Sequence, residues 1–101
     1  MNIQYIESVI CAEERMSTEE LHMRTRMRNI CEVRNIVMFL ALHYGNTESY
    51  VARHFGLDHA TAHHAKKAIM DLCDVYKEMK AKIDRYKILL KEEKVFYPIE
   101  Q

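Results

Sequence analysis

The sequence has few helix-breaking residues and no long apolar run. Its 101 residues include two glycines and one proline, while 49% of the residues are hydrophobic. A chain of this length forms one small domain, and the scarcity of glycine and proline predicts a core built from helices. Charged residues such as Glu7 and Arg15 interrupt the apolar positions near the N-terminus, so neither a signal peptide nor a membrane-spanning helix fits. We therefore predict an all-α cytoplasmic protein without a membrane partner.

Cysteines are also few, and the motifs of common enzymes are missing. Cys11, Cys31 and Cys73 are odd in number and lack CxxC spacing, which argues against a disulfide framework or a zinc ribbon. We expect them to be small, reduced core residues. The sequence contains no nucleotide-binding glycine loop, no nucleophile elbow and no recognisable motif of paired carboxylates. We predict that the chain is not an enzyme and takes no cofactor and no small-molecule substrate.

The formal net charge is zero, but the charges are unevenly distributed along the chain. Residues 1–21 hold one basic and five acidic groups, whereas residues 22–67 hold seven basic and three acidic groups together with all six histidines. A positive middle segment is typical of a surface that attracts nucleic acid. The alternative is an ordinary solvated surface whose charge asymmetry arose by chance.

The segment 47–69 predicts two short helices around one glycine turn. Thr47 can cap the first helix, Gly56 supplies a turn residue with positive φ, and Asp58 can cap the second helix. This is the pattern of a helix-turn-helix motif. The apolar positions that we expect to be buried are Val51, Ala52 and Phe55 in the first helix and Ala62, Ala65 and Ile69 in the second.

The second helix of this motif has polar residues on its outward face, beginning at its N-terminal end. Short polar side chains at that end suit base edges in the major groove, and the lysines that follow suit phosphates. The candidate contacts to double-stranded DNA on this helix are Asp58, His59, Ala60, Thr61, His63, Lys66 and Lys67.

His59 and His63 also raise the question of a metal. They are four residues apart, a spacing that lets two imidazoles share a zinc ion on one helix face. However, no HExxH carboxylate lies between them, and the sequence identifies no third ligand. We therefore interpret the two rings as contacts to DNA or solvent and predict no metal site.

Helical spacing continues through the first half of the chain. An apolar pattern over residues 3–10 predicts a first helix, and Ser17 with Glu20 forms a capping box that starts a short second one. A pattern of buried positions then follows from about residue 29 to residue 44 and ends at Gly45. We expect this long helix to be the spine of the domain.

A loop with three alternating arginines precedes the long helix. Arg24, Arg26 and Arg28 could merely make the loop soluble, or they could insert into a groove of DNA. No repeat, low-complexity tract or internal linker divides the chain. We predict one domain over residues 1–94 and a flexible tail over residues 95–101.

The run FGLDHATAHHA at residues 55–65 resembles the start of the recognition helix in the C-terminal DNA-binding domain, domain IV, of the bacterial replication initiator DnaA. The likeness extends back through the arginine loop and the start of the long helix, and it covers roughly residues 3–90. It implies a compact helical domain with a helix-turn-helix and a Trp-repressor-like arrangement.

The resemblance also implies roles for single residues. In the family, the arginine that matches Arg26 enters the minor groove, and the residues that match Asp58 and His59 read bases in the major groove. The family residues that match Arg34, Asn35 and Thr61 lie along the DNA backbone.

The sequence departs from the family pattern in the turn and just after it. One glycine of the turn is missing, Leu57 stands where the family has a base-reading arginine, and Ala60 replaces a threonine that touches a thymine methyl. Losing a bidentate contact to guanine removes about 1 to 3 kcal/mol of discrimination at that base pair. The resemblance therefore implies a mode of binding, and the DNA sequence recognised stays open.

The last helical segment carries a heptad seam. Such a seam requires a partner helix, either the first helix of the same chain or a second copy in a homodimer. Because no helix breaker occurs between Gly56 and Pro98, residues 57–94 could form one long helix or two helices joined near residues 71–74. After Ile69, the candidate dimer residues are Leu72, Tyr76, Met79, Ile83, Tyr86 and Leu90.

Together these patterns predict a domain that binds double-stranded DNA with sequence preference and acts in replication initiation or transcription. The recognition helix would enter the major groove, and the arginine loop would enter the minor groove. The alternative function is a helical interaction or dimerisation module that has lost specific DNA binding through Leu57 and Ala60.

Overall fold

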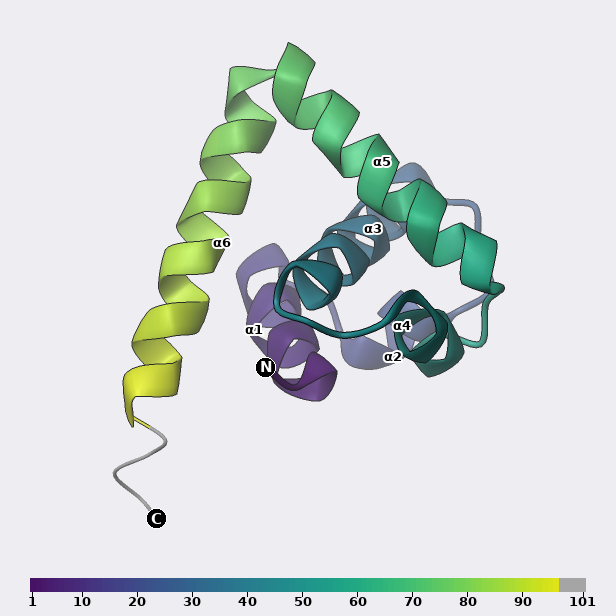
Figure 1. The fold of residues 1–101 in the computed structure, drawn as a ribbon, viewed down its shortest axis with the longest axis horizontal. Coiled ribbons are helices and arrows are strands. Elements are labelled where there is room, and N and C mark those ends of the chain that lie inside the picture. Colours follow the sequence, from purple (N-terminus) through teal and green to yellow (C-terminus); the bar gives the residue numbers. More distant parts are fainter. Residues whose placement is uncertain (97–101) are drawn as a thin grey trace.

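Six helices make up the part of the chain that the structure describes. The computed structural model describes the backbone of residues 1–96 and the side chains of residues 1–91. No strand occurs in this part, so the all-α prediction is confirmed (Figure 1). In chain order the helices are α1 (Ile3–Glu14), α2 (Thr18–His22), α3 (Arg28–His43), α4 (Glu48–His54), α5 (His59–Val75) and α6 (Lys77–Phe96).

Polar side chains satisfy the first backbone N–H groups of three helices. The Asn2 side chain accepts hydrogen bonds from the first turn of α1. Ser17 and Glu20 form the predicted capping box of α2, with both bonds at 3.0 Å. The Thr47 hydroxyl accepts from the Tyr50 N–H at the start of α4, as the sequence predicted. Asp58 occupies the N-cap position of α5, as predicted. Its side chain makes no capping hydrogen bond, so the prediction that it caps the helix was wrong.

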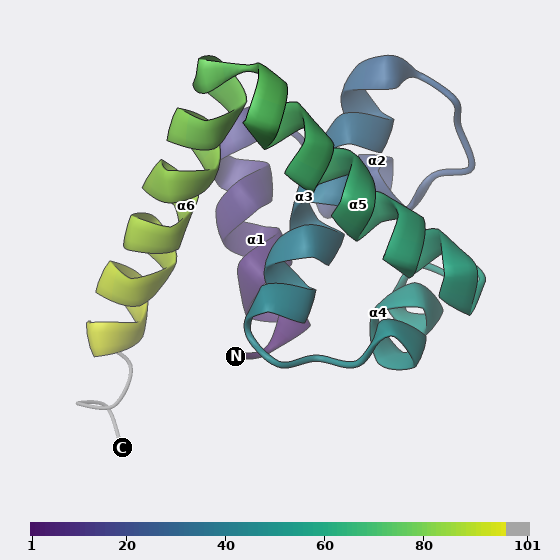
Figure 2. The ribbon, with the colours of Figure 1, turned by 45° about the horizontal axis from the view of Figure 1, so that its top comes forward.

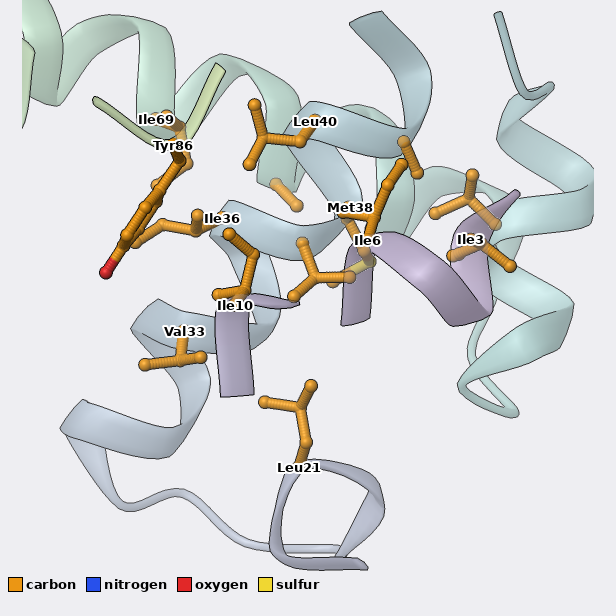
Figure 3. Packing of buried hydrophobic residues seen from close by; sticks show 14 of the residues in the cluster. Ile3, Ile6, Ile10, Leu21, Val33, Ile36, Met38, Leu40, Ile69 and Tyr86 are labelled. Atoms are coloured by element: carbon orange, nitrogen blue, oxygen red, sulfur yellow. The ribbon is translucent and has the colours of Figure 1, made fainter. Parts of the chain in front are cut away.

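Helix α3 is the spine of the domain, as predicted. It packs against α1, α2, α4 and α5, and one face of it is buried along its whole length. Figure 3 shows Ile36, Met38 and Leu40 of α3 among the isoleucines of α1. A helix the length of α1 is marginal in water by itself, so burial of Ile6 and its neighbours in this core stabilises it.

The chain changes direction between α5 and α6. Tyr76 adopts an extended conformation, with φ −115° and ψ 119°, and separates the two helices. The break therefore lies after the region 71–74 where the sequence placed a possible junction. Figures 1 and 2 show that α6 returns from this elbow along the side of α1. One continuous helix would carry the apolar residues of α6 away from the core.

The seam of α6 packs inside its own chain. Met79, Ile83, Tyr86 and Leu90 are buried, and α6 contacts α1. The Tyr5 hydroxyl donates to the Leu90 carbonyl at 3.0 Å across this contact. A homodimer through the predicted residues would have to replace these contacts, since of the six only Leu72 and Tyr76 are not buried.

Two further predictions concern the membrane and the tail. Within residues 1–96, no helix combines the length and the apolar character that a bilayer crossing requires. Val95 and Phe96 belong to α6. The rest of the tail predicted over residues 95–101 lies outside the described residues.

Candidate nucleic-acid interface

Helices α4 and α5 form a helix-turn-helix around Gly56. The glycine has a φ of +67°, a left-handed conformation that side chains with a Cβ rarely adopt, and this agrees with its predicted role. The Leu57 N–H donates to the Ala52 carbonyl at 2.8 Å, which closes the C-terminal end of α4. Phe55, Ala62 and the other predicted inward residues are buried between α4, α5 and α3.

The outward face of α5 carries the side chains that the sequence proposed for DNA. The exposed fractions of the His59 and His63 side chains are 65% and 61%. Thr61 is half-buried, so its hydroxyl is less accessible than the sequence suggested. The remaining candidates at this end of α5 are all exposed, namely Asp58, Ala60, Lys66 and Lys67.

A carboxylate that the sequence reading missed lies between the two histidines. His59 Nε2 and His63 Nδ1 each donate to a different oxygen of Glu48, both at 2.9 Å. The hydrogen bond from His63 and then that from His59 hold the pKa of Glu48 below its ordinary value. In the sequence, Glu48 directly follows a cap residue and reads as an ordinary first-turn acid, because only tertiary packing brings it to α5.

We expect Glu48→Gln to tighten DNA binding about two- to fivefold at low salt, because this carboxylate lies beside two candidate DNA contacts and repels phosphate. Fluorescence anisotropy with a labelled duplex would measure the change, which should shrink as salt rises. Asp84→Asn on α6 is the matched control for losing one exposed carboxylate. Weaker binding by Glu48→Gln would contradict the repulsion argument and show that the carboxylate is needed to orient the imidazoles.

Hydrogen bonds from α3 hold the arginine loop that joins α2 to α3. Arg34 on α3 donates through Nε to the Leu21 carbonyl at 2.9 Å and through Nη2 to the Met23 carbonyl at 2.7 Å. Cys31 Sγ donates to the Thr25 carbonyl at 3.4 Å further along the loop. The family resemblance places Arg34 on the DNA backbone, and in the structure its guanidinium binds two protein carbonyls while also lining the groove beside the loop. We propose that it positions the loop.

A groove separates the arginine loop from the turn of the helix-turn-helix. Its volume is about 690 Å³, and Arg24 and Arg26 border it on one side while Gly56 and Leu57 border it on the other. The guanidinium groups of Arg24 and Arg26 make no ion pair in the described part of the chain. The loop and the turn that precedes α5 therefore line one groove.

Two of the predicted site residues lie outside this surface. Arg28 begins α3 and borders hollows with Glu32 and Lys82, away from the groove. Asn35 is half-buried on α3 and does not line the groove. The structure brings Arg24 and Arg26 to the turn that precedes α5, and it leaves Arg28 and Asn35 apart from that groove.

A glycine turn between two helices, with a basic loop beside the second, defines a domain of the helix-turn-helix class. Residues 3–69 match the family of the bacterial dnaA protein helix-turn-helix. This match covers more than half of the sequence, and the chain belongs to that family. The resemblance seen in the sequence is thereby confirmed, and the family is one of DNA-binding domains.

Three curated proteins are similar to this chain, and each is a chromosomal replication initiator protein DnaA. The protein of Bacteroides fragilis is 29% identical over 97 residues, 94% of this chain and 20% of the relative. That of Bacteroides thetaiotaomicron is 30% identical over 94 residues, 91% of this chain and 20% of the relative. That of Flavobacterium psychrophilum is 30% identical over 86 residues, 83% of this chain and 18% of the relative. The chain thus spans about a fifth of the length of these relatives.

Proposed function

We propose that this domain binds double-stranded DNA with sequence preference, in a process related to replication initiation. The helix α5 enters the major groove, and the arginine loop enters the neighbouring minor groove. The observation that carries the proposal is the shared groove, because Arg24 and Arg26 border the same space as the turn that precedes α5. One duplex can then meet both elements at once.

Basic groups along this surface supply affinity that does not depend on sequence. Lys66 and Lys67 are exposed on α5, beyond the histidines, and Arg24 and Arg26 are exposed in the loop. Each lysine or arginine that neutralises a phosphate releases counterions, which makes binding weaker as salt rises. These groups set the orientation of the domain on the duplex.

The start of α5 supplies the sequence preference. The Asp58 carboxylate makes no capping hydrogen bond, so it is available to accept from a cytosine amino group. The exposed His59 ring and Ala60 methyl group follow Asp58 directly, in the first turn of α5. Leu57 offers no hydrogen bond to guanine, so we expect a preferred sequence that differs from one read by an arginine at this position.

Selection from a pool of random duplexes tests the proposal directly. We expect a single enriched motif, with binding that weakens steeply as salt rises. Binding without any enriched motif would contradict sequence preference. Absence of binding at low salt would favour the rival function, a helical interaction module, and analytical ultracentrifugation would then reveal whether a second copy is the partner.

Arg26→Ala should weaken binding to every duplex and reduce the slope of log K against log salt by about one unit, because one phosphate-neutralising charge is lost. Salt titrations of wild-type protein and variant on the selected duplex would measure this. Lys91→Ala on α6 removes one exposed charge from another element and should leave the slope unchanged. An unchanged slope in Arg26→Ala would exclude the arginine from the interface.

His59→Ala should instead relax base preference, by about 1 kcal/mol at one base pair, and change the salt slope little. Competition between the selected duplex and single-base variants of it would measure the loss of discrimination. His64→Ala is the control, since His64 is also exposed on α5 but makes no contact with Glu48. Equal discrimination by His59→Ala and wild-type protein would exclude His59 as a base reader.

A further inference from the structure

A second histidine cluster lies beneath the arginine loop, around a buried carboxylate. Glu7 on α1 is 5% exposed, and among the described residues it is the one charged group in the buried set. His22 Nε2 and His54 Nε2 both approach the same oxygen of Glu7, His54 at 3.3 Å and His22 more closely. The three ligand atoms all lie within 4.8 Å of one another. Three helices thus direct two nitrogens and one oxygen toward one point.

Ring packing limits the movement of both imidazoles. The His22 ring stacks on Phe55 with 4.7 Å between centroids, and it meets the His54 ring edge-on at 4.9 Å. The His54 ring also meets Phe55 edge-on at 4.9 Å. These contacts keep the two Nε2 atoms near the carboxylate and reduce the loss of rotamer freedom on binding a ligand.

We propose that Glu7, His22 and His54 form a site for a zinc ion. Two imidazoles and one carboxylate are a donor set that Zn²⁺ takes in proteins, with one coordination position left for water. Tetrahedral zinc with bonds of about 2.05 Å requires ligand atoms about 3.3 Å apart. The separation of His54 Nε2 and Glu7 Oε2 meets this requirement, whereas His22 Nε2 lies closer to that oxygen and would have to move outward to make room for the ion. The alternative for the same residues is a hydrogen-bonded ion pair without a metal.

His59 and His63 form a poorer metal site than the buried cluster, although their spacing in the sequence is one that zinc can use. His59 and His63 bind different oxygens of Glu48, so their nitrogens do not converge on one point. Both rings are also more exposed than His54, whose side chain is 15% exposed. The sequence could not reveal the buried cluster, because Glu7 lies 15 residues from His22 and 47 residues from His54.

A zinc ion at this position would join the end of α2 to α1 and α4. His22 is the last residue of α2 and borders the groove beside Arg24. Its side chain is 32% exposed, which leaves a path for the ion between solvent and the site. The metal would therefore hold the base of the arginine loop against the helix-turn-helix.

Metal titration of untagged, chelator-treated protein tests the proposal without DNA. We expect one equivalent of Zn²⁺ by isothermal titration calorimetry, and a rise in Tm on the order of 10 °C at a hundredfold excess of free zinc over Kd. Co²⁺ should give the visible absorption bands of tetrahedral coordination. No saturable binding of either metal would overturn the proposal in favour of the metal-free ion pair.

Single-residue variants then locate the site. We expect His54→Ala and Glu7→Gln each to weaken Zn²⁺ binding at least tenfold and to abolish the Co²⁺ bands, while His63→Ala binds like the parent. Circular dichroism would verify that each variant is folded, and His22→Ala is a second variant that removes a more exposed ligand. Loss of binding in His63→Ala with retention in His54→Ala and His22→Ala would place the metal at the surface histidines and overturn the assignment.

Discussion

Replacing Tyr86 by alanine should lower the free energy of unfolding by about 3 to 5 kcal/mol, the usual cost of removing a large buried aromatic ring. Tyr86 is the largest of the fully buried side chains and lies where α6 packs on the core (Figure 3). Small domains have a total stability of about 5 to 15 kcal/mol, so this variant should be close to unfolding. Urea denaturation followed by circular dichroism would measure the loss.

Tyr86→Phe is the matched control for this experiment. It keeps the ring and removes the hydroxyl, which donates to Glu14 at the α1–α6 contact. Burial, and then the hydrogen bond to Glu14, raise the pKa of Tyr86 above its ordinary value, so the hydroxyl remains a donor at neutral pH. We expect Tyr86→Phe to cost about 1.5 to 3 kcal/mol, the contribution of one hydrogen bond to a charged group.

The same measurement separates the two interpretations of the heptad seam. If Tyr86 packs within its own chain, the loss of stability will not depend on protein concentration. If it packs across a homodimer, the unfolding midpoint will rise with concentration. A midpoint that is unchanged in Tyr86→Ala would contradict the packing of α6 on α1.

Arg34→Ala should weaken DNA binding at least tenfold for every sequence. The substitution leaves the Leu21 and Met23 carbonyls without the guanidinium that holds them, and hydrogen bonds to a charged group contribute about 1.5 to 3 kcal/mol. The loop that carries Arg24 and Arg26 would then lose its fixed position at the border of the groove. Fluorescence anisotropy would measure affinity, and amide hydrogen exchange would report the release of the loop.

Arg34→Lys distinguishes this role from direct contact with a phosphate. Lysine keeps the positive charge but has no planar fork with which to reach both carbonyls. If Arg34 positions the loop, Arg34→Lys should bind DNA almost as weakly as Arg34→Ala. If Arg34 neutralises a phosphate, the lysine variant should retain most of the affinity, and the positioning role would be wrong.

Much of the fold could be predicted because its signals are local. Ser17 with Glu20 and Thr47 each form caps within three residues along the chain, and Gly56 marks a turn by its own conformational freedom. Helical periodicity likewise identified α3 as the spine. The candidate DNA surface on α5 was predictable for the same reason, since one helix displays its outward residues at known spacing.

The features that had to await the structure depend on contacts between distant segments. Tyr76 breaks the helix although no glycine or proline stands there, because α6 must return to bury its apolar face on α1. Arg34 reads as a DNA contact in the sequence, and only the tertiary structure brings the Leu21 and Met23 carbonyls to its guanidinium.

The amino-acid sequence alone determined the helical class, the helix-turn-helix and the family, because caps, turns and periodicity act over a few residues. Only the tertiary structure decided which polar side chains of different helices contact one another. It placed Glu48 against two histidines of α5, and it enclosed Glu7 with His22 and His54. Such clusters follow from packing, since burying a carboxylate requires partners that only the folded chain can bring to it.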